Sequence, residues 1–212
     1  MAVGKVSDLS SALNTGDSEE LTARKSALRA DLRARRDLAQ AQADEDVVKR
    51  VSDVILFEIL ADLPLAQKAT IGGYFPIHSE MSPLPLLARL DEIGHQTGLP
   101  WVIDVDVPLV FGAWAPGEAN AAGPFGTRVP KAGAAQFIPD VVLVPLLGVD
   151  TEGYRLGYGG GFYDRTLEKL RQAGDVVAIG LGYECQLLEE VPRGVHDQQL
   201  DWMVTEQGVT CF

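Results

Sequence analysis

The sequence predicts a three-layer α/β fold, in which an open, mainly parallel sheet carries helices on both faces. Three short apolar runs, at 70–75, 141–144 and 176–181, have the length and β-branched content of buried strands. Segments with helical periodicity alternate with these runs, and this alternation favours a parallel sheet. A chain of 212 residues with 46% hydrophobic residues is also long enough to bury a complete core.

The first helix is expected from Thr22 to Ala39. Leu28 and Leu32 are four residues apart on one stripe, and Lys25 and Arg29 share another. Residues 1–21 are mostly polar and acidic and lack a sustained apolar face, which predicts a mobile N-terminal tail. The sequence therefore indicates a single domain at 22–212.

Caps and periodicity predict the elements that follow. A second helix is expected from Asp44 to about Ala61, and a third begins at the cap formed by Ser82 and Pro83. A loop at 76–80 separates the third helix from the strand at 70–75. The remaining expected elements are strands at 101–105, 109–114 and 202–205, a loop-rich segment at 117–133 and a helix at 163–173.

Composition limits the class of protein. The formal net charge of −12 argues against nucleic-acid binding, because most of such a surface repels a polyanion. There is no secretory signal pattern, and the longest apolar run, at 141–147, contains Pro145 and is too short to span a bilayer. We therefore expect a cytoplasmic protein without a membrane partner, a monomer or weak dimer, in which Cys185 and Cys211 are reduced.

Positive charge is concentrated in the first expected helix. Lys and Arg are good helix formers, so this cluster can be an ordinary solvated helix face. In a protein with this net charge, it is also where an anionic ligand would find local positive charge. The cluster consists of Arg24, Lys25, Arg29, Arg33, Arg35 and Arg36.

The stretch from Arg155 to Arg165 holds four glycines within the five positions 157–161. Glycine costs about 0.5–1 kcal/mol relative to alanine in a folded element, so such a cluster needs a reason. The apolar run at 141–144 precedes the cluster and the helix at 163–173 follows it. A glycine loop between a strand and a helix N-terminus exposes N–H groups to an anion such as phosphate. A flexible hairpin or a helix-capping turn is the alternative.

Several common motifs are absent. Phe162 stands in place of the third glycine of G-x-G-x-x-G, which argues against a dinucleotide cofactor, and G-x-x-x-x-G-K-[ST] does not occur. The three histidines are scattered without zinc-ligand spacing, and the serine-hydrolase elbow G-x-S-x-G is missing. A different kind of phosphate loop is expected, with its lysine supplied by Lys25 or Lys131.

Five sequence blocks occur in the same order as in a known family. They are Lys25-Ser26-Ala27-Leu28-Arg29, Tyr74-Phe75-Pro76 with Glu80, Leu143-Val144-Pro145, the stretch from Arg155 to Arg165, and His196-Asp197. Over about residues 22–207 the chain resembles the 5-formyltetrahydrofolate cyclo-ligases, also called methenyltetrahydrofolate synthetases. The resemblance implies a Rossmann-like α/β fold and a ligase that converts 5-formyltetrahydrofolate to 5,10-methenyltetrahydrofolate. It also implies that ATP is a co-substrate, that Mg²⁺ is required, and that ADP and phosphate are released.

The resemblance implies roles for individual residues. Lys25, Arg29 and Arg155 would be the catalytic cations that hold the ATP phosphates. Mg²⁺ would bind Asp164 and Asp197, since it takes only one or two protein carboxylates. The alternatives are a helix-start carboxylate favoured by the helix dipole at 164 and a turn residue at 197. The whole ATP site would comprise Lys25, Arg29, Arg155, Gly157, Tyr158, Gly159, Gly160, Gly161, Phe162 and Tyr163.

The folate would contact a second set of residues. In the family, the position of Glu80 implies a hydrogen bond to the pterin or formyl end of the substrate. A lone glutamate in a loop is more often only solvated, and aromatic residues beside a buried strand can equally belong to the core. The expected substrate contacts are Phe75, Glu80, Tyr158, Phe162 and Trp114.

Two positions depart from the family's pattern. Gly194 stands where many members carry Glu, and Val129 stands where Glu or Gln is frequent; neither belongs to the expected site. Two other functions stay open: a catalytically silent folate or nucleotide-binding module, and a phosphosugar isomerase. The isomerase would need a poised base near the glycine loop, and the sequence shows none. Retention of Lys25 and Asp164 favours the enzyme over the silent module.

Overall fold

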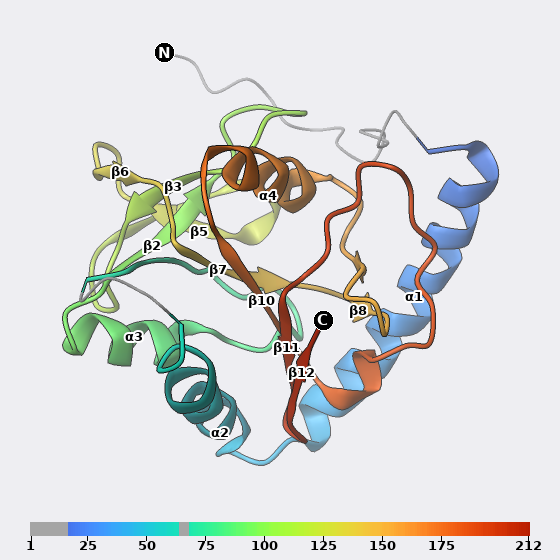
Figure 1. The fold of residues 1–212 in the computed structure, drawn as a ribbon, viewed down its shortest axis with the longest axis horizontal. Coiled ribbons are helices and arrows are strands. Elements are labelled where there is room, and N and C mark those ends of the chain that lie inside the picture. Colours follow the sequence, from blue (N-terminus) through green and yellow to red (C-terminus); the bar gives the residue numbers. More distant parts are fainter. Residues whose placement is uncertain (1–16, 64–67) are drawn as a thin grey trace.

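The centre of the protein is a mixed, mostly parallel sheet (Figure 1). A computed structural model describes residues 17–63 and 68–212. Eight strands follow the order β12-β11-β10-β7-β1-β2-β3-β6, and the five from β11 to β2 are parallel to one another. The three other strands pair antiparallel at the two edges. The predicted fold class, an open and mainly parallel sheet, is confirmed.

The parallel strands are β1 (Thr70–Gly72), β2 (Gln96–Trp101), β7 (Val141–Pro145), β10 (Val177–Leu181) and β11 (Trp202–Val204). The antiparallel edge strands are β3 (Val110–Ala113), β6 (Gln136–Phe137) and β12 (Val209–Cys211). Two small hairpins lie outside this sheet and pair β4 (Asn120–Ala122) with β5 (Arg128–Pro130) and β8 (Gly148–Val149) with β9 (Arg155–Leu156).

Helices cover both faces of the sheet. In Figure 1, α2 and α3 lie on one side of the sheet, α4 lies on the other, and α1 runs along the β8 side of the molecule. No helix in the described residues has the length and apolar character needed to cross a membrane. The helices are α1 (Glu19–Gln42), α2 (Val47–Val54) with a π-helical continuation at Ile55–Ile59, α3 (Leu84–Glu92) and α4 (Phe162–Ala173), with 3₁₀ turns at Pro124–Gly126 and Glu184–Gln186.

The central strand β7 shows why two helical layers form. Its side chains alternate between the faces of the sheet, as the period of a strand requires. Val141 and Leu143 belong to the core that contains α2 and α3, whereas Val142 and Val144 belong to the core that contains α4. All four are 0% exposed. A run that is apolar at every position is therefore stable only when both faces are covered.

Helix α1 packs through few residues. Only Lys25, Leu32 and Arg36 are buried along its 24 residues, and Leu32 contacts an apolar cluster with the β8–β9 hairpin. The helix begins at Glu19, capped by the Ser18 hydroxyl, which accepts a hydrogen bond from the Leu21 N–H at 3.2 Å. The first helix thus starts three residues before its expected start, within the segment assigned to the tail. Residues 1–16 lie outside the described part of the chain.

The middle of the chain differs most from expectation. The strand expected at 101–105 is instead β2, at Gln96–Trp101, whereas the strand expected at 109–114 is confirmed as β3. Gly98 and Pro100 resemble turn residues, but a Cβ at Gly98 would collide with the Gly112 carbonyl of the adjacent strand. The glycine permits close strand pairing that the sequence alone does not reveal. The β4–β5 hairpin and the edge strand β12 were not predicted either.

Candidate active site

A cavity of about 1240 Å³ lies at the carboxyl ends of the parallel strands. Its wall includes Phe75 after β1, Val102 after β2 and Pro145 at the end of β7. Helix α1 and the loop between β9 and α4 close it from the other side. Open α/β sheets commonly bind ligands at this edge. The structure brings the glycine loop and the loop after Phe75 to the same cavity, although more than seventy residues separate them in sequence.

The glycine loop runs from β9 into the N-terminus of α4. Gly159 has φ of 104° and Gly161 has φ of 64°, so both adopt left-handed conformations that favour glycine. Gly157 is different, since a Cβ placed there would meet nothing within 4 Å. Two arginines hold the loop, because Arg29 Nε donates to the Gly157 carbonyl at 2.9 Å and Arg165 Nη2 donates to the Gly160 carbonyl at 2.6 Å. The hairpin β8–β9 separates the loop from β7, which the sequence did not indicate.

Lys25 stands at one end of the cavity between two carboxylates. Its Nζ lies 2.7 Å from Oδ2 of Asp17 and 2.7 Å from Oδ2 of Asp197. Burial by itself would lower the pKa of Lys25, but the hydrogen bonds to both carboxylates raise it above its ordinary value. The pKa of Arg29 is lowered by burial and by the neighbouring Arg33. Lys25 therefore stays cationic in a place with little water.

Arg155, which is buried, and Asp164, which is half-buried, form a second ion pair beside the glycine loop. Arg155 Nη2 donates to Asp164 Oδ1 at 2.8 Å, and Nη1 donates to the Gln198 carbonyl at 2.6 Å. Asp164 Oδ1 also accepts from the Gln198 N–H at 3.0 Å, so α4 meets the segment that carries Asp197. We call the part of the cavity formed by Lys25, Arg29, Arg155 and the glycine loop the anion end.

The two carboxylates expected to bind Mg²⁺ therefore lie in adjacent segments and both line the cavity. Each already pairs with a cation, and the described residues contain no group of three or more His, Cys, Asp or Glu side chains arranged for a metal. Mg²⁺ takes one or two carboxylates and completes its shell with water and phosphate oxygens. The donor set of Asp164 and Asp197 fits an ion that arrives with a phosphate ligand rather than one held by the protein alone.

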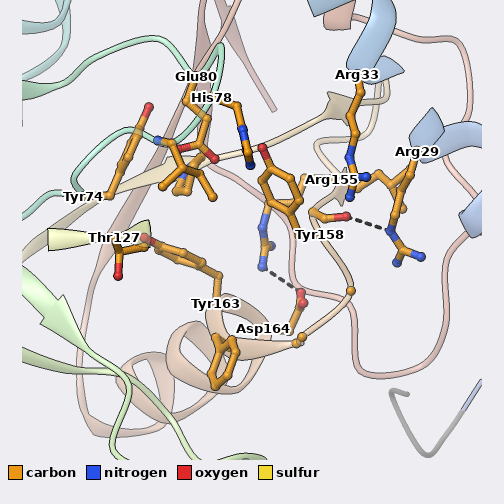
Figure 2. A pocket seen from close by; sticks show the side chains of 18 of the residues that line it. Arg29, Arg33, Tyr74, His78, Glu80, Thr127, Arg155, Tyr158, Tyr163 and Asp164 are labelled. Atoms are coloured by element: carbon orange, nitrogen blue, oxygen red, sulfur yellow. Dashed lines mark hydrogen bonds and ion pairs between the residues drawn. The ribbon is translucent and has the colours of Figure 1, made fainter. Parts of the chain in front are cut away.

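Glu80 stands at the opposite end of the cavity, which we call the carboxyl end. Its side chain is 4% exposed, and Oε2 accepts the Ile77 N–H at 2.9 Å. Burial raises the pKa of Glu80 to about 7, while the Ile77 N–H, Arg36 and Tyr158 act to lower it. Figure 2 shows Glu80 on one side of Tyr158, with Arg29 and Arg33 of α1 on the other. Glu80 is thus a titratable group that interacts with Tyr158 of the glycine loop, where the sequence indicated no base.

Most residues expected in the site line this cavity. They are Lys25, Arg29, Phe75, Glu80, Arg155, Gly157, Tyr158, Gly159, Gly160, Gly161, Phe162, Tyr163, Asp164 and Asp197. Trp114 does not. It is 6% exposed and packs in the core with the side chains that contact α2 and α3, and its indole N–H donates to the Glu118 carbonyl at 3.3 Å. For this residue the structure favours the core, the alternative that the sequence left open.

Sequence reasoning missed other residues of the cavity. Asp17 lay in the expected tail, and Arg33 and Arg36 were recognised only as part of a basic cluster. The available signal was the helical spacing of the basic residues, which puts Arg33 and Arg36 one and two turns beyond Arg29. Arg24 and Arg35 are exposed, so the solvated-face interpretation applies to these two members. Val129, which departs from the family's pattern, also lines the cavity, contrary to its expected position outside the site.

Comparison with known proteins decides the family. The sequence profile of the 5-formyltetrahydrofolate cyclo-ligase family matches residues 21–206. The chain belongs to this family. A cyclo-ligase from Mycolicibacterium smegmatis is 38% identical over 155 residues, which are 68% of this chain and 77% of the relative. A cyclo-ligase from Haemophilus influenzae is 30% identical over 185 residues, 85% of this chain and 92% of the relative. The expected membership of the cyclo-ligases is confirmed.

Solved cyclo-ligase structures share this fold. The 5,10-methenyltetrahydrofolate synthetase of Aquifex aeolicus superposes with a TM-score of 0.64 and 25% identity, covering 87% of this chain and 92% of its own. The enzyme of that name from Mycoplasma pneumoniae also gives 0.64, covering 86% of this chain and 98% of its own. Its identity of 22% supports the common fold alone.

Proposed function

We propose that this cyclo-ligase family member converts 5-formyltetrahydrofolate to 5,10-methenyltetrahydrofolate, consuming ATP in the presence of Mg²⁺ and releasing ADP and phosphate. One observation carries the proposal: a single cavity joins a cationic, glycine-lined end to a buried carboxyl end. A phosphate group and a polar heterocycle need these two environments, and here they face each other across Tyr158 (Figure 2).

The chemistry explains why charge and alignment suffice. An N-formyl amide is a poor electrophile, because its nitrogen donates electrons into the carbonyl. The formyl oxygen attacks the γ-phosphorus of ATP, and ADP leaves. The N10 amine then adds to the activated carbon and loses its proton, the C–O bond breaks, and phosphate departs. Phosphoryl transfer depends mainly on positioning and on neutralisation of charge, so no nucleophilic side chain is required.

The anion end has the groups for the nucleotide. Lys25, Arg29 and Arg155 supply three cations, and the N–H groups of the glycine loop supply donors without charge. Because a Cβ at Gly157 would meet only open space, that glycine leaves room for a ligand rather than for a protein neighbour. A bound phosphate would replace the carboxylates that now pair with Lys25. Asp164 and Asp197 would hold Mg²⁺, which neutralises phosphate charge when bound.

The carboxyl end has the groups for the folate. Phe75 and Phe162 offer aromatic faces, and Tyr158 offers both a ring and a hydroxyl. Glu80 adds a carboxyl group at this end, and with a pKa of about 7 it can accept or donate a hydrogen bond near neutral pH. A pterin ring, which carries both donors and acceptors, fits such a partner.

The experiment is to incubate the purified protein with 5-formyltetrahydrofolate, ATP and Mg²⁺ and to follow the near-ultraviolet absorbance of the methenyl product. Product should form with all three components and should be lost when ATP is omitted or EDTA is added. Folded protein that binds both substrates but yields no product would support the catalytically silent module instead.

Three further expectations belong to this proposal. The enzyme acts on small molecules in the cytoplasm, engages neither nucleic acid nor membrane, and is a monomer or weak dimer. Size-exclusion chromatography with light scattering at several protein concentrations tests the last of these.

A further inference from the structure

Arg36 is the most deeply buried charged residue of α1, with 1% of its surface exposed. A buried guanidinium is costly unless its donors are paired. Here each nitrogen has an acceptor: Nε donates to Ser79 Oγ at 3.0 Å, Nη1 to the Leu146 carbonyl at 3.1 Å, and Nη2 to the Tyr158 hydroxyl at 2.6 Å. The three acceptors belong to three separate segments of the chain. Arg36 thus connects α1 to all of them.

Two of these segments carry residues of the proposed site. Ser79 immediately precedes Glu80, and Arg36 Nη1 lies 4.0 Å from Glu80 Oε1. Tyr158 belongs to the glycine loop, and its ring also lies beneath the guanidinium, with Arg36 Cζ 5.6 Å from the ring centre. The Ser79 hydroxyl bonds in turn to Asp37, the next residue on α1. The planar fork of arginine suits such divergent acceptors, which the single ammonium group of lysine cannot reach together.

We propose that Arg36 is a positioning residue, which fixes the Glu80 carboxyl and the Tyr158 hydroxyl relative to each other by tying their two loops to helix α1. The inference rests on the proposed function, because it takes Glu80 and Tyr158 as the groups that meet the folate. Arg36 itself borders the cavity, but with 1% of its surface exposed it acts through these groups. A small displacement of groups that align substrates costs much of the rate, so the connection matters for turnover.

The charge of Arg36 also affects how Glu80 titrates. The groups that face Glu80 are Arg36 from α1, Tyr158 from the glycine loop, Tyr74 after β1 and Tyr163 from α4. Arg36 is the cation among them, and it lowers a pKa that burial raises. Removal of this charge therefore moves the titration of Glu80 to higher pH. A lysine at position 36 keeps the positive charge, so it should leave the titration largely unchanged.

The test compares Arg36→Gln and Arg36→Lys with the control Arg35→Gln. Arg35 is the adjacent residue on the same helix, but it is exposed and pairs with Asp31. One measurement is kcat/KM for 5-formyltetrahydrofolate at saturating ATP. The other is the ¹³C NMR titration of the Glu80 carboxyl, assigned by its loss in Glu80→Gln. The second measurement needs no activity, so a wild-type protein without turnover would contradict the proposed function and still allow Arg36 to be tested.

We expect both Arg36 variants to lose kcat/KM for the folate by about tenfold or more, with KM for ATP changed by less than about twofold. Arg36→Gln raises the Glu80 titration midpoint, Arg36→Lys leaves it near the wild-type value, and Arg35→Gln changes neither quantity. A titration midpoint unaltered by Arg36→Gln, or wild-type kcat/KM in the folded fraction of both variants, overturns the proposal.

Ser79→Ala provides the test if the Arg36 variants do not fold. It removes the acceptor of Arg36 Nε next to Glu80 and leaves the guanidinium with its other two partners. The proposal requires a loss of kcat/KM for the folate in this variant. Wild-type kinetics in Ser79→Ala would mean that the connection between α1 and the Glu80 loop has no part in positioning.

Discussion

The two ends of the cavity differ in whether a buried ionisable side chain keeps its charge. Lys25 and Glu80 are similarly inaccessible, with side chains 6% and 4% exposed. Lys25 touches two carboxylates at 2.7 Å, and its pKa rises, so it keeps its charge. Glu80 has its cation at 4.0 Å, and burial dominates, so its pKa rises to about 7 and its charge is partly lost. Direct contact with an opposite charge, rather than the degree of burial, decides whether these two side chains stay ionised.

The difference suits two kinds of ligand. At the anion end, a permanent cation surrounded by exchangeable carboxylates can accept a phosphate without a change of its own protonation. At the carboxyl end, a group that titrates near neutral pH can match a heterocycle with both donors and acceptors.

Lys25→Ala should lower turnover by about a hundredfold to a thousandfold, the range found when one stabilising donor is removed from a charged transition state. The variant also leaves Asp17 and Asp197 without their cation, so the melting temperature should fall. Steady-state kinetics with ATP and a thermal melt measure both effects. Arg24→Ala, at an exposed neighbouring position, is the control. Turnover within about twofold of wild type would remove Lys25 from the proposed mechanism.

Glu80→Gln should change how stability depends on pH. In the unfolded chain Glu80 ionises near its ordinary pKa of 4.5, but in the folded protein it ionises only near 7. The wild type therefore loses stability as pH rises from about 4.5 to 7, by up to about 3 kcal/mol, and keeps that loss at higher pH. Glu80→Gln has no carboxyl group at this position, so it lacks this loss of stability.

Urea unfolding at pH 5 and pH 8 measures the effect. The stability advantage of Glu80→Gln over wild type should be larger at pH 8. The matched control is Glu168→Gln on the exposed face of α4, which should show no pH-dependent difference. Equal differences at the two pH values would mean that Glu80 is ionised like an exposed carboxylate, and the contrast between the two ends would fail.

Gly157→Ala should separate ligand binding from folding at the anion end. A Cβ there meets nothing within 4 Å in the protein, so the free energy of unfolding should change by less than about 0.5 kcal/mol. If ATP lies against this backbone, KM for ATP should rise by roughly tenfold. Gly174→Ala, at the far end of α4 and equally uncrowded, serves as the control. An unchanged KM would show that the nucleotide does not approach Gly157.

Trp114→Phe should have the smallest effect on kinetics. Trp114 belongs to the core and lies outside the cavity wall, so KM for the folate should stay at the wild-type value. The loss of packing and of the indole hydrogen bond should cost about 1–2 kcal/mol of stability. Phe75→Leu, within the cavity, is expected to raise KM for the folate instead. A higher KM in Trp114→Phe would extend the carboxyl end of the cavity to β3.

Local signals explain which parts of the fold could be predicted. The uniformly apolar run Val141–Val144 indicated a strand covered on both faces, and the alternation of strands with helices indicated a parallel sheet. Strand β2 was misplaced because Gly98 and Pro100 look like turn residues when their neighbours are unknown. The requirement for glycine there comes from the carbonyl of Gly112 on the next strand, a contact that depends on pairing between distant segments.

In the candidate site, too, the sequence identified some residues and not others. Residue types and their order identified Lys25, Glu80, the glycine loop and Asp197 as belonging together, because the resemblance to the cyclo-ligases covers most of the chain. It did not identify Arg36, since an arginine among six basic residues on one helix carries no mark of burial. Neither could it indicate that Trp114 packs in the core.

Periodicity and short-range motifs are properties of the chain, so the sequence alone predicted the α/β class, the family and 14 of the residues that line the cavity. The tertiary structure decided the state of those residues. Asp17 and Asp197 keep Lys25 charged only because the fold brings positions 17, 25 and 197 into contact. Glu80 titrates near 7 only because the fold buries it away from a close cation. Charge and solvation depend on neighbours in space, and only folding determines those neighbours.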